Sequence, residues 1–267
     1  MKLVDTHTHS YFSADSKMDV VAALEQTRRN GLQGIVFTEH YDFDVPEGLL
    51  AFEFDPQEQQ KTIRELADRH ANGLTVLTGI EVGMQPESFD KIHGLLDQHD
   101  FDQIIASIHF VDQEDPYHGG YYVGKEARQA YGRYLETIYT CIQQMKSFDI
   151  LGHFDYIARY APYPDSVRYA DFPDLFDAIF RHLVQHGQAL ELNTKTYYIK
   201  PDGSPIPDPN IFCRFRELGG EALSFGSDAH KLEHIGIRFP DYAALAKEFG
   251  FRYSVYYQNR KPIFLPL

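Results

Sequence analysis

The chain has 267 residues, of which 43% are hydrophobic and 24% charged, and this ordinary composition excludes a globally disordered chain. It carries 25 Lys and Arg against 39 Asp and Glu, so its formal net charge is −14, which argues against general binding to nucleic acid or to anionic membrane surfaces. The two cysteines, Cys141 and Cys213, are too few for a disulfide framework, and no apolar run is long enough to span a membrane. We therefore expect a soluble, cytoplasmic protein.

Apolar segments rich in β-branched residues alternate with helical segments, which end at signals such as Asn30-Gly31. The strand-like segments are Lys2–Thr6, Gly34–Thr38, Thr75–Ile80, Gln103–Ser107, Asp149–Leu151, Ala189–Leu192 and Ala222–Gly226. Nearly continuous apolar runs are typical of strands buried on both faces of a parallel sheet. Repeated strand–helix units without a linker predict one α/β domain, residues 1–267, with a β/α barrel rather than an open sheet. The tail from Arg252 to Leu265 predicts a hairpin around Asn259.

Each predicted strand ends in side chains of the metal-ligand type. These residues are His7 and His9, Glu39 and His40, Glu81, His109, His153 and Asp155, Glu191 and Asn193, and Asp228 and His230. If the strands are parallel, these groups converge on the C-terminal mouth of the barrel, where β/α barrels place their chemistry. One His-X-His pair is a weak signal, but a complete series of such endings predicts a metal site. Imidazole and carboxylate ligands without thiolate favour Zn, Mn or Fe.

The order of these motifs resembles a known family over nearly the whole chain. The matching stretches are HisXHis at 7–9, ThrGluHis at 38–40, GlyIleGlu at 79–81, SerIleHis at 107–109, GlyHisPheAsp at 152–155 and SerAspAlaHis at 227–230. They are similar to the polymerase-and-histidinol-phosphatase (PHP) family, and within it to the monofunctional histidinol-phosphate phosphatases. The resemblance implies a distorted (β/α)7 barrel with about two to three divalent ions, Zn, Mn or Fe, at the C-terminal face of the strands.

The resemblance also implies three metal positions. His7, His9, Glu81 and Asp228 would hold the first ion; Glu81 would bridge to a second, completed by His109 and His153; and Asp15, His40 and His230 would hold the third. The expected nucleophile is a hydroxide that bridges two ions and attacks phosphorus in line. We expect Glu81, Asp15, His40 and His230 to be the catalytic residues, with Asp15, His40 or a water on the third metal left open as the group that protonates the leaving alkoxide.

Three residues are candidates for substrate binding. Arg159 follows the His153 strand by a short loop, and a guanidinium there would clamp phosphate oxygens. Lys195 departs from the pattern of related phosphatases, so it either supplies the phosphate contact or alters specificity. His118 lies in an aromatic loop that is expected above the metals, where it would shape a substrate pocket or form a simple surface loop.

The predicted function is hydrolysis of a small phosphate monoester, L-histidinol phosphate, in histidine biosynthesis. The alternatives are another PHP-family phosphoesterase, such as a protein-tyrosine phosphatase or a nucleotide phosphoesterase, and a metal-binding regulatory domain with a dead site. The net charge argues against a nuclease, and the nine filled ligand positions argue against a dead site. The pair His182 and His186 has the spacing of a helical metal pair, but its helix turns other residues inward, so we expect both on the solvent side. The sequence predicts no oligomeric state.

Overall fold

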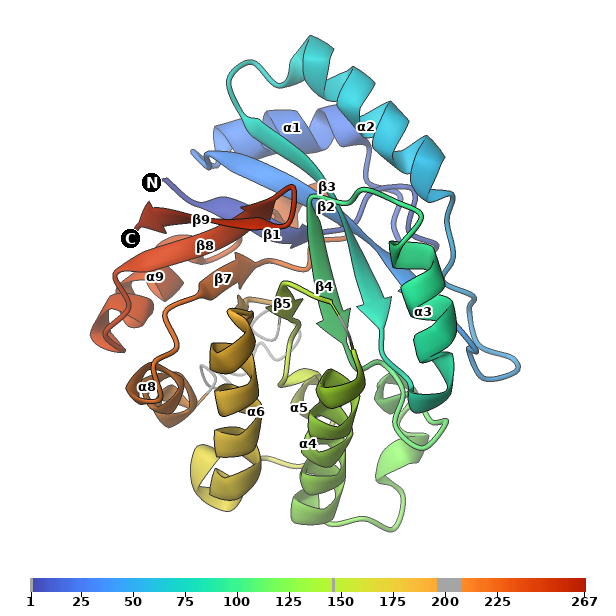
Figure 1. Ribbon diagram of the computed structural model, residues 1–267, viewed down its shortest axis with the longest axis vertical. Helices are drawn as coiled ribbons and strands as arrows, with labels where there is room; N and C mark the ends of the chain where they lie inside the picture. The colour runs from blue at the N-terminus through green and yellow to red at the C-terminus, as the bar shows by residue number, and fades with distance from the viewer. Residues whose placement is uncertain (1, 146, 196–207) are drawn as a thin grey trace.

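The computed structural model describes residues 2–145, 147–195 and 208–267. In this part of the chain, seven parallel strands pair side by side in chain order. They are β1 (Val4–Thr8), β2 (Gly34–Asp42), β3 (Thr75–Gly83), β4 (Gln103–Ser107), β5 (Ile150–Leu151), β6 (Ala189–Asn193) and β7 (Leu223–Gly226). The sheet curls into a nearly closed barrel with helices around it (Figure 1), which confirms the predicted β/α barrel.

Helices cover the outside of the barrel (Figure 1). The described α-helices are α1 (Val20–Arg29), α2 (Pro56–His70), α3 (Phe89–Leu96), α4 (Ala127–Gln144), α5 (Tyr156–Arg159), α6 (Pro173–His186), α8 (Pro209–Glu217) and α9 (Phe239–Glu248). Short 3-10 helices add η1 (Pro86–Ser88), η2 (Pro116–His118), η3 (Gly120–Tyr122), η4 (Tyr169–Asp171) and η5 (Leu232–His234). None of the helices in the described ranges is long and apolar enough to cross a bilayer.

Local sequence signals set the ends of these helices. The Asp19 side chain accepts a hydrogen bond from the backbone N of Ala22 at 2.9 Å and so caps the N-terminus of α1. The same helix ends at Asn30, where Gly31 takes a φ of +69° that side chains rarely adopt. The stop that Asn30-Gly31 predicted is therefore confirmed, and it returns the chain to the barrel at β2.

The strands β2 and β3 extend further than their apolar runs predicted. Their parallel pairing continues through His40 opposite Glu81 to Asp42 opposite Gly83. A ladder depends on backbone hydrogen bonds, so it can run on past the last apolar side chain. His40 and Glu81 consequently lie on strands, not on the loops after them, and this gives both side chains a rigid support.

The barrel closes between β1 and β7 through a short set of backbone contacts. The N of Asp228 donates to the O of His7 at 2.8 Å, and the N of His9 donates to the O of Ala229 at 2.9 Å. Thr8 and Ala229 form an isolated parallel bridge at the same place. Closure therefore fixes the end of β1, with its two histidines, against the segment that follows β7.

The C-terminal tail forms the predicted hairpin, with β8 (Tyr253–Gln258) antiparallel to β9 (Lys261–Pro266). Asn259 and Arg260 make its two-residue turn, with φ values of +50° and +62°. The hairpin packs against the starts of the barrel strands, where Tyr256 contacts a cluster with Val4, Val36 and Leu77. It thus covers the end of the barrel opposite to the C-terminal mouth.

Candidate metal centre

Glu81 lies at the centre of a cluster of histidines at the C-terminal mouth of the barrel. Its carboxylate is fully buried, and five imidazoles from four other strands or strand ends surround it. Its Oε2 lies 2.8 Å from His40 Nδ1, 3.0 Å from His7 Nε2 and 3.5 Å from His9 Nε2, while its Oε1 lies 2.7 Å from His153 Nε2 and 3.2 Å from His109 Nε2. One carboxylate therefore faces two separate groups of imidazoles, one on each oxygen, as a bridging ligand must.

The charge balance keeps this carboxylate ionised. Burial raises the pKa of Glu81, but the positive charges of His7, His40 and His109 outweigh burial and hold that pKa well below its usual range. The pKa of His7 is shifted in the opposite direction, well above its usual range. Burial lowers its pKa, and the carboxylates of Glu81 and Glu191 raise it further than burial lowers it.

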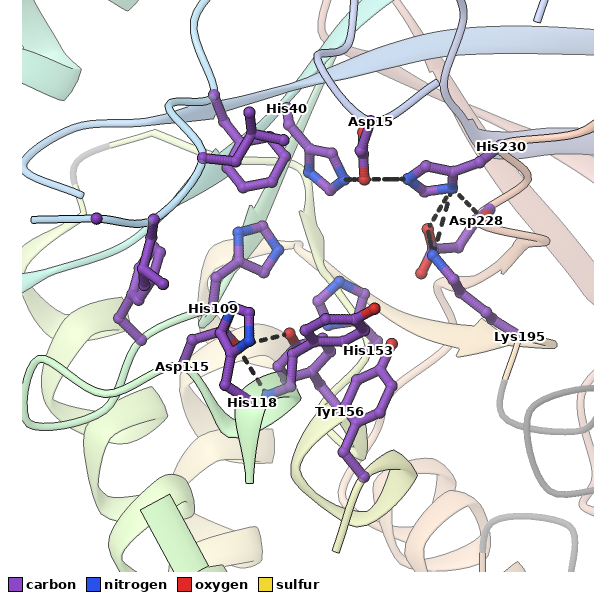
Figure 2. Close-up of a pocket in the computed structure, with 17 residues that line it drawn as sticks. Asp15, His40, His109, Asp115, His118, His153, Tyr156, Lys195, Asp228 and His230 are labelled. Atoms are coloured by element: carbon purple, nitrogen blue, oxygen red, sulfur yellow. Dashed lines mark hydrogen bonds and ion pairs between the residues drawn. The ribbon is translucent and has the colours of Figure 1, made fainter. Parts of the chain in front are cut away.

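Asp228, Asp15 and His230 extend the cluster towards the surface. Asp228 Oδ1 lies 3.4 Å from His9 Nε2, so it shares the position that His7 and His9 face. Figure 2 shows the Asp15 carboxylate between two imidazoles, with its Oδ2 2.9 Å from His230 Nε2 and 3.7 Å from His40 Nε2. The structure thus brings together all nine residues that the sequence predicted as ligands.

The donor set fits divalent metal ions. Four of the facing atoms, His7 Nε2, His9 Nε2, His40 Nδ1 and Glu81 Oε2, are buried and make no hydrogen bond within the described part of the chain. A buried polar atom without a hydrogen bond is costly, and several of them pointing at one another need a common partner. Overlapping groups of three ligand atoms, such as His7, His9 and Glu81 or Glu81, His109 and His153, lie within 4.8 Å of one another. Nitrogen and oxygen donors at this spacing suit Zn, Mn or Fe.

Two further carboxylates accept hydrogen bonds from the imidazole nitrogens that point away from Glu81. Glu191 Oε1 accepts a hydrogen bond from His7 Nδ1 at 2.7 Å, and Asp42 Oδ1 accepts one from His109 Nδ1 at 2.9 Å. Such bonds fix the ring orientation and direct the other nitrogen at a metal. Asp42 was not among the predicted residues, although its spacing of two residues from His40 places both on one face of β2.

Glycine makes room for one of these bonds. A Cβ at Gly226 on β7 would overlap the Glu191 carboxylate and lie 2.7 Å from the Cβ of His7. The position therefore has no space for a side chain while Glu191 contacts His7. At Gly83 a Cβ would likewise overlap the carboxylate of Asp42.

A cavity of about 500 Å³ opens above the cluster. Asp15, His40, His109, His153, Asp228 and His230 contribute to its floor, and its walls include Phe52, Phe110, Asp115, Tyr117, His118, Tyr156, Tyr160 and Lys195 (Figure 2). The Tyr156 hydroxyl donates to Asp115 Oδ1 at 3.1 Å. Aromatic walls with one carboxylate and a cationic residue suit a small polar ligand that carries both a ring and charge. Asp115 and Tyr156 were not among the predicted site residues, although both lie in the aromatic segments after β4 and β5.

The three predicted substrate-binding residues differ in their places. Lys195 lies on the cavity wall with its Nζ 2.8 Å from Asp228 Oδ1, and His118 lies exposed at the cavity. Arg159 is 2% exposed and is not among the described residues that line the cavity. Its NH1 instead donates to Asp228 Oδ2 at 2.8 Å. Burial raises the pKa of Asp228, but Lys195, His7 and Arg159 together hold that pKa well below its usual range.

The pair His182 and His186 lies away from the cluster, on α6. His182 is half-buried and His186 is exposed, and the Nδ1 of His186 contacts the O of His182 at 2.8 Å. The inward face of α6 is made by Phe176, Ile179, Phe180 and Leu183, as the periodicity predicted.

Comparison with known proteins gives consistent matches over the chain. A family model described as PHP domain matches residues 5–195. The chain is 31% identical over 258 residues to a probable histidinol-phosphatase of Clostridium acetobutylicum, which covers 96% of this chain and 97% of the relative. It is 30% identical over 253 residues to a histidinol-phosphatase of Lactococcus lactis subsp. lactis, which covers 94% and 93%. The crystal structure of histidinol phosphate phosphatase from Lactococcus lactis subsp. lactis, complexed with zinc, L-histidinol and phosphate, matches with a TM-score of 0.88 and 28% identity over 98% of this chain and 99% of that one.

Proposed function

The chain belongs to the PHP domain family, and from that premise we propose that it is a metal-dependent phosphatase that hydrolyses L-histidinol phosphate to L-histidinol and phosphate. The observation that carries the proposal is the buried carboxylate of Glu81 among five imidazoles, directly beneath a cavity large enough for a small phosphate monoester. The similarity over nearly the full length to an enzyme solved with zinc, L-histidinol and phosphate supports the same substrate. We treat residues 1–267 as one catalytic domain, because the C-terminal hairpin packs onto the barrel.

The distances within the cluster support the ligand roles that the family resemblance implies. His7, His9 and Asp228 would hold one ion on the Oε2 side of Glu81, and His109 and His153 would hold another on its Oε1 side. Asp15, His40 and His230 would hold a third near the surface. Bound divalent ions supply Lewis acidity, which lowers the pKa of a coordinated water towards 7 and offsets charge on the phosphoryl oxygens.

The chain itself supplies cationic groups for the phosphate. Lys195 reaches the cavity, and its Nζ lies beside the Asp228 carboxylate, where it would contact a phosphate oxygen as a point charge. The buried guanidinium of Arg159 fixes Asp228 from the other side, so any direct contact of Arg159 with phosphate requires that this ion pair rearrange. We therefore propose Lys195 as the first phosphate contact and Arg159 as the support of Asp228.

The remaining wall of the cavity suits the organic part of the substrate. L-Histidinol carries an amine and an imidazole ring. The Asp115 carboxylate, held by Tyr156, would accept hydrogen bonds from the cationic amine. Tyr117 and Tyr160, which meet edge to face with ring centroids 5.0 Å apart, and the exposed His118 offer aromatic surface to the ring.

Metal removal and reconstitution test this function. Purified protein is treated with a chelator, dialysed, and then reloaded with Zn or Mn, and phosphate release from L-histidinol phosphate is measured at each stage. The proposal predicts that activity disappears with the metal and returns on reloading. Activity that survives complete metal removal would overturn it, and so would a reloaded protein that binds metal without releasing phosphate.

A further inference from the structure

A serine and a carboxylate lie behind His9, on the side away from the metal centre. Glu39 is fully buried on β2, and Ser13, 2% exposed, lies in the turn that follows β1. Ser13 Oγ donates to Glu39 Oε2 at 2.8 Å, and the backbone N of Ser10 donates to the same oxygen at 2.9 Å. The Ser10 hydroxyl donates to the other oxygen, Glu39 Oε1, at 2.6 Å. The Glu39 carboxylate thus holds this turn by three hydrogen bonds.

The hydrogen bonds of the Ser13 hydroxyl determine which ring nitrogen of His9 carries the proton. A serine hydroxyl has one hydrogen, and Ser13 gives it to the carboxylate of Glu39. The two other groups near Ser13 Oγ must then be donors. One is the backbone N–H of His40 at 3.1 Å, and the other is His9 Nδ1 at 3.2 Å. The proton of His9 therefore lies on Nδ1, which leaves the lone pair of Nε2 directed at Glu81 and Asp228.

At two other histidines of the cluster a carboxylate contacts Nδ1 directly, with no serine between them. His7 Nδ1 contacts the Glu191 carboxylate, and His109 Nδ1 contacts the Asp42 carboxylate, in each case without an intermediate. At His9 the carboxylate acts through Ser13. The Ser13 hydroxyl also accepts a hydrogen bond from the backbone N of His40. Ser13 therefore contacts both His9, a ligand of the first proposed metal position, and the strand that carries His40, a ligand of the third.

We propose that Ser13, oriented by Glu39, is a positioning residue of the metal centre that sets the Nδ1-protonated form of His9 and thereby its metal affinity. The inference rests on the metal centre that the proposed function requires, and not on the identity of the substrate. Supporting groups of this kind typically change metal affinity about 10- to 100-fold when they are removed.

The experiment compares Ser13→Ala with Ser10→Ala as its matched control. Both variants remove one buried hydroxyl that donates to Glu39, but of the two hydroxyls it is the one of Ser13 that contacts the His9 ring. Each protein is loaded with Zn, and metal affinity is measured by competition with a chromogenic chelator. We expect Ser13→Ala to bind at least one of its zinc ions about tenfold or more less tightly than wild type, and Ser10→Ala to stay within about twofold at every ion. Ser13→Thr keeps the hydroxyl and should restore most of the affinity.

Equal affinity of Ser13→Ala and wild type would overturn the proposal, and so would an equal loss in both serine variants. A measurement on the unaltered protein does not depend on any variant. The ¹⁵N shifts of the His9 ring in the zinc-loaded protein should report a protonated Nδ1 and a metal-bound Nε2, and a metal-bound Nδ1 would overturn the inference. If wild type binds neither Zn nor Mn, the proposed function itself fails, which distinguishes the two failures.

Discussion

The Arg159→Ala substitution separates the structural role of this arginine from the contact with phosphate that its place in the sequence suggested. The side chains of Arg159 and Asp228 are 1% and 3% exposed, and their contact distance is 2.8 Å. Lys195, the other cation on Asp228, is 18% exposed and lies at the cavity. Removing the guanidinium therefore leaves the buried carboxylate of Asp228 with Lys195 at the rim and the nearby imidazoles of His7 and His9 as partners.

The expected magnitude follows from this burial. Breaking a buried ion pair by removing one partner typically costs about 3–5 kcal/mol, since the remaining charge stays desolvated. Because Lys195 still contacts the other oxygen of Asp228, we expect the low end, about 3 kcal/mol of unfolding free energy. For a chain of this size that corresponds to a decrease in Tm of roughly 6–12 °C.

Urea unfolding of the metal-free proteins measures this loss, with Lys195→Ala as the control at the rim. Lys195→Ala should change the unfolding free energy by less than about 1 kcal/mol but lower kcat/KM for L-histidinol phosphate roughly a hundredfold, because a charge on the transferring phosphoryl group is lost. If Arg159→Ala is as stable as wild type and its kcat/KM is reduced as far as in Lys195→Ala, then Arg159 is a phosphate clamp and not the support of Asp228.

Three further outcomes are expected. Glu81→Gln should retain about one ion per chain or fewer by elemental analysis, because the Glu81 carboxylate faces both groups of imidazoles, and a full metal complement would contradict this. Gly226→Ala should weaken metal binding about tenfold in chelator competition, because the new Cβ displaces Glu191 from His7; unchanged affinity would argue against that support. Hydrogen bonds from Arg214 lower the pKa of Asp177 to about 2, so this pair stabilises the fold above the unfolded pKa of about 4 and loses that effect as the pH falls through about 2. Asp177→Asn should therefore be less stable than wild type in urea unfolding at pH 7, and a difference that persists at the same size near pH 2 would contradict the assignment.

The structure brings the candidate ligands together because all of them except Asp15 follow an apolar run. Asp15 lies in the turn after β1 and was placed only by the family resemblance. In a parallel barrel, the ends of such runs meet at one mouth whatever the lengths of the connections. His7 and Asp228 are thus brought together although most of the chain separates them. The strand ends predicted near His40 and Glu81 were too early, since the hydrogen-bonded ladder runs past the apolar residues by which a strand is recognised.

The supporting contacts could not be predicted in the same way. Glu191 was part of the expected set of strand ends, but its partner His7 lies 184 residues away, and nothing local indicates that pairing. Arg159 ends a helix of four residues whose direction depends on how the barrel closes. Sequence spacing therefore placed it near the cluster, while packing against Asp228 decided that its guanidinium is buried.

The identity of the substrate can be tested by one panel of kcat/KM values. The protein, loaded with Zn and separately with Mn, is assayed for phosphate release from L-histidinol phosphate, from phosphotyrosine peptides and from nucleoside monophosphates at matched concentrations. We expect L-histidinol phosphate to be preferred by at least about a hundredfold, since the cavity offers Asp115 to its amine and Lys195 to its phosphate. A higher kcat/KM for phosphotyrosine peptides or for nucleotides would leave the metal centre in place and contradict the proposed function.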